Sequence, residues 1–174
     1  MKKKFKVTFL FDKNNNWFEK YFLKIKINKK KYYIKKTHNK KDVKNQDILF
    51  IINYTKILSK DFLKKNKLNL VVHASKPPKD KGFAPVSYQI LRNKSLIHIS
   101  IIEAKEKVDS GNIYLQQKFK LDGTELYNEI KYKTAKAILR IIQEFLKIYP
   151  NKINIKKQKG KESFNKKRNL NNDE

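Results

Sequence analysis

His73 and Asp109 are the two side chains in this sequence whose types and surroundings best suit proton transfer. His73 opens the segment HASKPPKDKGFAP (73–85), and Asp109 lies in VDSGNIYLQ (108–116); each segment holds one of only four glycines in the chain. An imidazole and a carboxylate that face one crevice can move a proton and stabilise a developing charge. Gly82 and Gly111 supply a positive φ angle, or room for a ligand beside the backbone. The sequence therefore predicts an acid–base site built on His73 and Asp109.

A structural interpretation competes with this prediction at both positions. A histidine at the end of a buried strand often serves only the core, and an aspartate before a glycine often serves only a turn. The remaining histidines, His38 and His98, show no metal-ligand spacing, so the sequence indicates no metal site.

Alternating strands and helices are expected to position the pair. Continuous apolar runs predict buried strands, and apolar residues at helical spacing predict helices. Strands are expected at 6–11, 31–36, 47–54, 68–73, 97–103 and 113–119, and helices at 14–27, 55–67, 85–93 and 124–149, the last capped by Thr124 and stopped by Pro150. This order predicts an α/β fold with a Rossmann-like, mainly parallel sheet flanked by helices. Ligands of such sheets bind beyond the carboxyl ends of the strands, where His73 is placed.

The length of 174 residues indicates one domain, residues 1–150, followed by a basic polar tail, residues 151–174. The tail has no apolar periodicity and is expected to be mobile or extended. It also resembles a connector that leads into a C-terminal region, so the chain is either a minimal version or a truncated one.

The formal net charge of +27 is weak evidence for a nucleic-acid partner. Of the 43 basic residues only three are arginine, although nucleic-acid interfaces favour the bidentate guanidinium. A joint excess of lysine, asparagine and isoleucine is typical of an A/T-rich genome and spreads lysine over every solvated face. The chain has no cysteine, no apolar run of membrane-spanning length, and a start that is read as a strand and not as a signal peptide, so a cytoplasmic protein without a membrane partner is expected.

Four segments in this order resemble the formyltransferases that use 10-formyltetrahydrofolate. These are DILFIINYTKIL (47–58), HASKPPKDKGFAPVSYQIL (73–91), VDSGNIYLQ (108–116) and LDGTEL (121–126), and the resemblance covers roughly residues 5 to 150. Within the family the chain is most similar to the short bacterial sugar N-formyltransferases. The resemblance implies the formyltransferase fold and 10-formyltetrahydrofolate as co-substrate.

The resemblance also assigns roles. His73 and Asp109 fall on the catalytic histidine and aspartate, and Gly82 and Gly111 on the structural glycines beside the folate. Residues implied for the folate pocket are Ile57, Leu58 and Lys107, with Ser75 holding its loop or donating to the ligand, and those implied for a nucleotide-sugar acceptor are Asn15, Asn16 and Trp17. For Trp17, packing in the core is the favoured alternative to a ligand contact.

One position departs from the family pattern. The family has an asparagine two residues before the histidine, where this chain has Val71. That amide donates a hydrogen bond to the formyl oxygen as it becomes an oxyanion. Asn69, four residues before His73, is an imperfect substitute.

An amino sugar, nucleotide-linked and destined for a surface glycan, is the expected acceptor. Initiator methionyl-tRNA is disfavoured because that enzyme carries a further C-terminal domain, and glycinamide ribonucleotide is disfavoured because the local match is poorer. The resemblance is compatible with a homodimer. Two alternatives stay open: a catalytically inactive protein that binds folate or a nucleotide sugar, and a basic nucleic-acid-binding protein.

Overall fold

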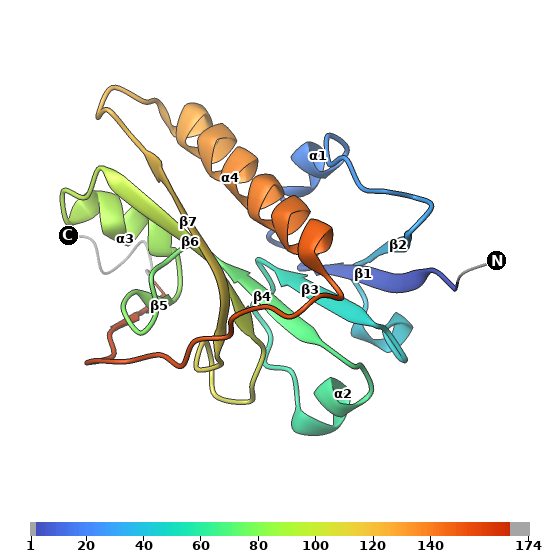
Figure 1. The fold of residues 1–174 in the computed structure, drawn as a ribbon. Helices are drawn as coiled ribbons and strands as arrows, with labels where there is room; N and C mark the ends of the chain where they lie inside the picture. Colours follow the sequence, from blue (N-terminus) through green and yellow to red (C-terminus); the bar gives the residue numbers. More distant parts are fainter. Residues whose placement is uncertain (1–2, 168–174) are drawn as a thin grey trace.

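A computed structural model describes residues 3–167, whose strands form one six-stranded sheet and one small two-stranded sheet (Figure 1). The large sheet has the order β2-β1-β3-β4-β6-β7. Its strands are β1 (Phe5–Phe11), β2 (Tyr32–Thr37), β3 (Ile48–Ile52), β4 (Asn69–His73), β6 (Leu96–Glu103) and β7 (Ile113–Lys120). The first four pair in parallel, whereas β6 is antiparallel to both β4 and β7. The predicted mainly parallel α/β sheet is confirmed.

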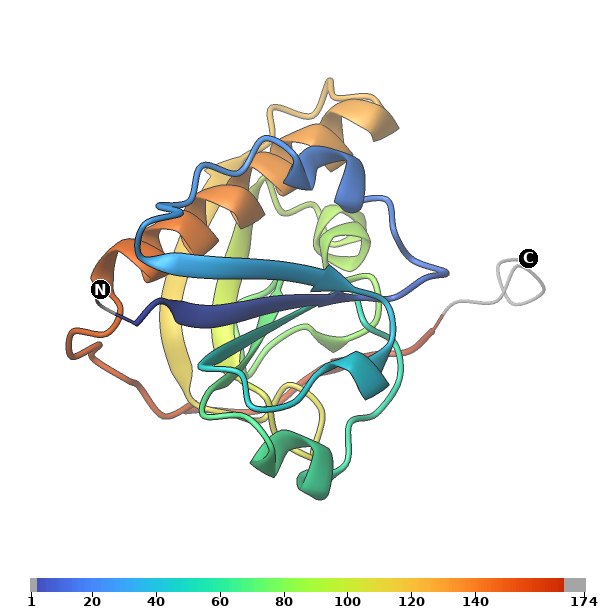
Figure 2. The same cartoon turned by 90° about the vertical axis from the view of Figure 1, so that its right-hand side faces the viewer.

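Helices lie on both faces of the sheet. They are α1 (Glu19–Phe22), α2 (Lys60–Lys64), α3 (Pro85–Leu91) and α4 (Tyr127–Ile148), and a short 3₁₀ turn covers Lys40–Asp42. Figure 2 shows α1 and α4 above the sheet and α2 below it. The larger core cluster joins α4 to β1, β3, β4 and β6, and the smaller one packs Phe62 of α2 against Leu49 and Ile51.

Two helix predictions were wrong in extent. The helix expected over 14–27 is a single turn, Glu19–Phe22: before it the Asp12 side chain accepts the Asn14 amide, and residues 25–28 after it have no regular structure. Phe18 and Phe22 are nevertheless buried, so the spacing of apolar residues in this segment correctly indicated which side chains are buried, but not a long helix.

Helix α4 begins later than expected. Thr124 does not cap it, because its hydroxyl donates to Asp122. The helix starts at Tyr127. At the residue before it, the Leu126 amide donates a hydrogen bond to the Glu129 side chain at 2.8 Å. Its end at Ile148, just before Pro150, is as predicted.

The chain after α4 runs extended across the molecule and returns to the loop that follows β4 (Figure 1). Lys156 forms an antiparallel bridge with Ile113, and β8 (Phe164–Asn165) pairs with β5 (Lys81–Gly82). We call residues 156–166 the C-terminal strap. The last seven residues of the predicted tail, 168–174, lie outside the described residues. Among the helices of residues 3–167, none is long and apolar enough to cross a membrane.

Candidate active site

The carboxyl ends of the parallel strands bring a row of polar residues to one level of the sheet. Phe11 is paired with Ile52, and Ile52 with Val72. The residues that follow them, Asp12, Asn53 and His73, therefore end three adjacent strands, and His73 in turn pairs with Ser100 of β6. A polar residue directly after each buried apolar run is what produces this row.

His73 is buried at the centre of the row, with 8% of its surface exposed. Its Nε2 atom lies 3.0 Å from the Asp80 carbonyl oxygen and 3.5 Å from Asp109 Oδ2. Within residues 3–167, Nδ1 has no hydrogen-bond partner. A carboxylate and a carbonyl on one side of the ring favour the tautomer with its proton on Nε2. The predicted catalytic pair is therefore brought together.

Asp109 is held by backbone groups of two loops. Its Oδ2 accepts the Gly82 amide at 2.9 Å, and its own backbone has a φ of 49°. The backbone of Gly111 packs directly against that of Glu103, and a Cβ atom at position 111 would lie 1.9 Å from the Glu103 carbonyl oxygen. The two predicted glycines thus serve the aspartate directly, one by donating to it and one by allowing its loop to pack closely.

The loop after β4 is anchored through Asp80. The Asp80 carboxylate accepts hydrogen bonds from the side chains of Arg92 and Lys94, and its amide donates to Ser163 Oγ at 2.9 Å. Because the Asp80 carbonyl contacts His73, these bonds fix the partner of the imidazole.

The C-terminal strap packs against the Asp109 loop and the loop that follows β4. Gln158 Nε2 donates to the carbonyls of Asp109 at 2.8 Å and Gly111 at 2.7 Å. Glu162 accepts from Lys81 Nζ at 2.8 Å and from Lys107 Nζ at 3.1 Å. The Lys81 ammonium lowers the pKa of Glu162, with a further contribution from Lys107. These contacts could not be predicted from the sequence, because the tail has no apolar pattern.

Ser75 is fully buried two residues after His73. Its carbonyl accepts from Ser100 Oγ at 2.6 Å, which fixes the loop, while its own hydroxyl has no partner in the described part of the chain. Among residues 3–167, five buried side-chain atoms have no hydrogen-bond partner: Asn53 Nδ2, Ser75 Oγ, Thr134 Oγ1, Gln158 Oε1 and Asn165 Nδ2. All but that of Thr134 lie at the end of β3, on this loop or on the strap. Buried polar groups are normally satisfied, so this concentration is typical of a ligand site.

The residues predicted to line a folate pocket have different surroundings. Ile57 is 69% exposed in the loop between β3 and α2, whereas the Leu58 side chain packs in the smaller core with Phe62. The Leu58 side chain therefore serves packing, and only its backbone remains for a ligand. Lys107 lies in the loop that carries Asp109 and pairs with Glu162.

The segment after β1 lies beside the same end of the sheet. Asn15 Nδ2 donates to the Asn53 carbonyl at 3.3 Å, and Asp12 accepts from the Thr55 amide and hydroxyl. The Thr55 hydroxyl is the main cause that lowers the pKa of Asp12. A surface hollow here is lined by Asn16, Trp17, Glu19, Lys20, Leu23 and Lys36. Trp17 also packs against the larger core, as the alternative interpretation predicted.

Neither Val71 nor Asn69 supplies an amide at His73. Val71 packs against the smaller core. Asn69 starts β4, and its amide group donates to the Leu63 carbonyl at 2.8 Å and accepts from Asn66. The suggestion that Asn69 substitutes for the family amide is therefore wrong. Asn53 and Asp12 were not predicted as site residues. Both share with His73 the feature that identified it: each is a polar residue at the end of an apolar run.

A family model described as "Formyl transferase" matches residues 2–146. The methionyl-tRNA formyltransferase of Prochlorococcus marinus is 30% identical over 115 residues, which cover 63% of this chain and 35% of that protein. That of Fervidobacterium nodosum is 34% identical over 104 residues, covering 60% of this chain and 33% of that protein. The chain thus spans about a third of the length of these curated relatives.

Solved structures share the fold. The methionyl-tRNA formyltransferase from Clostridium thermocellum superposes with a TM-score of 0.75 at 20% identity, over 97% of this chain and 74% of that one. A 4-N formyltransferase from Francisella tularensis gives 0.68 at 17% identity, over 92% and 76%. The formyltransferase PseJ from Anoxybacillus kamchatkensis, solved with UDP-4,6-dideoxy-4-formamido-L-AltNAc and tetrahydrofolate, gives 0.65 at 16% identity, over 92% and 85%.

Proposed function

Because the chain belongs to the formyl transferase family, we propose that it transfers the formyl group of 10-formyltetrahydrofolate to the amine of an amino sugar. The observation that carries this proposal is the buried His73 at the carboxyl end of β4, with Asp109 Oδ2 3.5 Å from its Nε2 atom. The unpartnered Ser75 hydroxyl beside it fits a polar ligand at the same place. Tetrahydrofolate in the PseJ complex supports the co-substrate.

The reaction requires one proton to move and one oxygen to be stabilised. The amine nitrogen attacks the formyl carbon, and the carbonyl electron pair moves onto oxygen. When the pair returns, the bond from carbon to N10 of the folate breaks, and the proton lost by the amine is gained by N10. His73 stabilises the oxyanion by a hydrogen bond, and Asp109 orients the imidazole and takes the proton of the amine, which N10 then gains as the tetrahydrofolate leaves.

The hollow after β1 supports a nucleotide-linked sugar as acceptor. Its Trp17 ring offers a flat apolar surface and Lys20 supplies a positive charge suited to a diphosphate, while Lys36 is paired with Glu19 at 3.0 Å. The complex named for PseJ holds a UDP-linked formamido sugar.

The test is a transfer assay with the full chain and 10-formyltetrahydrofolate. Acceptors are nucleotide-linked amino sugars and, in a separate reaction, methionyl-tRNA. Release of tetrahydrofolate and the mass of the acceptor are both followed. We expect one formyl group on an amino sugar, and a loss of kcat of about 10² to 10⁴ in His73→Ala.

Other outcomes distinguish the alternatives. Transfer to methionyl-tRNA only would replace the proposed acceptor and keep the reaction. Folate binding without transfer to any acceptor would indicate the inactive binding protein. A His73→Ala variant with unchanged kcat would contradict the proposed site, and its circular dichroism spectrum serves as the control for folding.

A further inference from the structure

The proposed reaction calls for a hydrogen-bond donor to the formyl oxygen that residue 71 does not supply in this chain. The attacked formyl oxygen becomes an oxyanion, and a preorganised amide donor is worth a large factor in rate when it is aimed at that oxygen. Val71 cannot donate, and the Asn69 amide is committed to Leu63 at the opposite end of β4. An amide donor in place of Val71 must therefore come from elsewhere than β4.

Asn53 ends the strand next to His73. The register pairs Ile51 with Val71 and Ile52 with Val72, so Asn53 and His73 each directly follow the last paired residues of two neighbouring strands. Adjacent strands are about 4.8 Å apart, so an asparagine side chain spans from one strand end to the reacting groups held at the next.

The backbone at Asn53 is built for a turn at this place. Its φ of 52° takes the chain out of the strand, a conformation that asparagine tolerates better than most residues. The Asn53 carbonyl accepts from Asn15, so the main chain is fixed by the neighbouring loop. The side chain is thereby presented by a held backbone and not by a free loop.

The Asn53 amide nitrogen has no partner. Nδ2 is buried and makes no hydrogen bond with any group of residues 3–167. A buried donor without an acceptor is unfavourable, and one beside a catalytic pair is explained by an acceptor that arrives with the substrate.

We propose that Asn53 Nδ2 donates a hydrogen bond to the formyl oxygen as it becomes an oxyanion, in the role that Val71 cannot fill. This inference rests on the proposed formyl transfer. Asn53 and His73 then stabilise the same oxygen, while Asp109 acts through His73.

The test compares kcat and KM of four proteins in the transfer assay: wild type, Asn53→Ala, Asn69→Ala, and the double variant Asn53→Ala with Val71→Asn. We expect kcat to fall about 10²- to 10³-fold in Asn53→Ala with a smaller change in KM, since the lost bond strengthens only in the transition state. Asn69→Ala is the matched control and keeps the wild-type kcat. The double variant, which restores an amide two residues before His73, recovers at least about tenfold of the lost rate.

Each alternative result has a distinct meaning. A wild-type kcat in Asn53→Ala overturns the inference and leaves formyl transfer standing, as does a double variant that recovers nothing. A wild-type chain that transfers no formyl group overturns the proposed function itself, and the inference with it. Thermal unfolding of each variant separates loss of the fold from loss of the donor.

Discussion

At the scale of single residues, the geometry of the catalytic pair depends on how closely two backbones approach. Asp109 reaches His73 because its loop packs onto the end of β6, and Gly111 makes that contact with the Glu103 carbonyl. The approach leaves no room for a side chain. Gly123, by contrast, has a φ of 96° and no atom within 4 Å of the place that a Cβ would take. A substitution there therefore measures the effect of the backbone conformation without any steric overlap.

We predict that Gly111→Ala lowers the free energy of unfolding by at least about 3 kcal/mol, because the loop must move to relieve the overlap. Gly123→Ala is expected to cost about 1 to 2 kcal/mol, from its positive φ alone. Urea unfolding of both variants measures the difference. Equal losses would show that the contact with Glu103 is readily relaxed.

At the scale of elements, the C-terminal strap is what fixes the loops that carry the catalytic residues. It adds a strand to β5, binds two carbonyls of the Asp109 loop through Gln158, and places Glu162 between Lys81 and Lys107. The Lys81 side chain is fully buried, so Glu162 is the group that neutralises it. A polar segment thus contributes to the fold by hydrogen bonds and charge instead of apolar burial.

From the contacts of Glu162 in the strap, we predict that the free energy of unfolding falls at acid pH. The pKa of Glu162 is lower in the folded protein than its ordinary value of 4.5, so its contribution is complete above that value and is lost as the pH falls through the folded pKa. Urea unfolding at a series of pH values should show a steeper loss of stability below about pH 4.5 in the wild type than in Glu162→Gln. Parallel curves for the two proteins would contradict the role of this ion pair.

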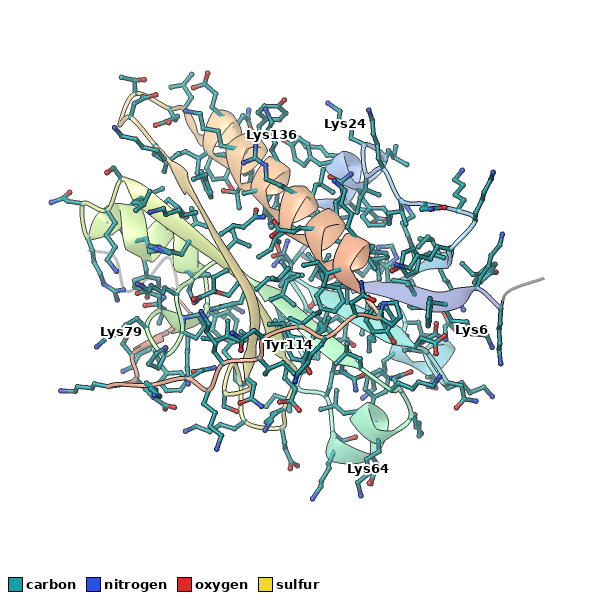
Figure 3. The ribbon with its side chains drawn as sticks, in the orientation of Figure 1. Lys6, Lys24, Lys64, Lys79, Tyr114 and Lys136 are labelled. Carbon is teal, nitrogen blue, oxygen red and sulfur yellow. The ribbon has the colours of Figure 1, made fainter. Side chains whose placement is uncertain are left out.

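At the scale of the whole molecule, the dominant feature is charge. A formal net charge of +27 on 174 residues produces self-repulsion that the few acidic residues cannot balance. Figure 3 shows Lys6, Lys24, Lys64, Lys79 and Lys136 on different sides of the ribbon. Repulsion spread over the whole surface opposes folding and is screened by salt.

We therefore predict that the melting temperature rises by a few degrees between about 10 mM and about 150 mM sodium chloride, as the Debye length shortens from about 30 Å to about 8 Å. Differential scanning calorimetry measures it, and potassium chloride should give the same curve because screening depends on ionic strength. A fall in melting temperature would show that ion pairs such as Lys94 with Asp80 outweigh the repulsion.

The sequence by itself determined where the six main strands lie along the chain, the place of His73 at the end of one of them, and the family. Apolar runs define buried strands whatever their neighbours are, and a polar residue that follows such a run lies at a sheet end. The extents of α1 and α4 were less well predicted; for α4, the Glu129 side chain accepts the Leu126 amide directly before the helix begins.

Only the tertiary structure decided which groups meet around His73. Strand register placed Asn53 beside it, loop packing brought Asp109 to 3.5 Å from its ring, and the strap added Gln158 and Glu162 from far along the chain. These contacts join residues that are distant in sequence and have no shared periodicity. Their energy comes from hydrogen bonds, charge and close backbone packing, which exist only once the sheet has formed.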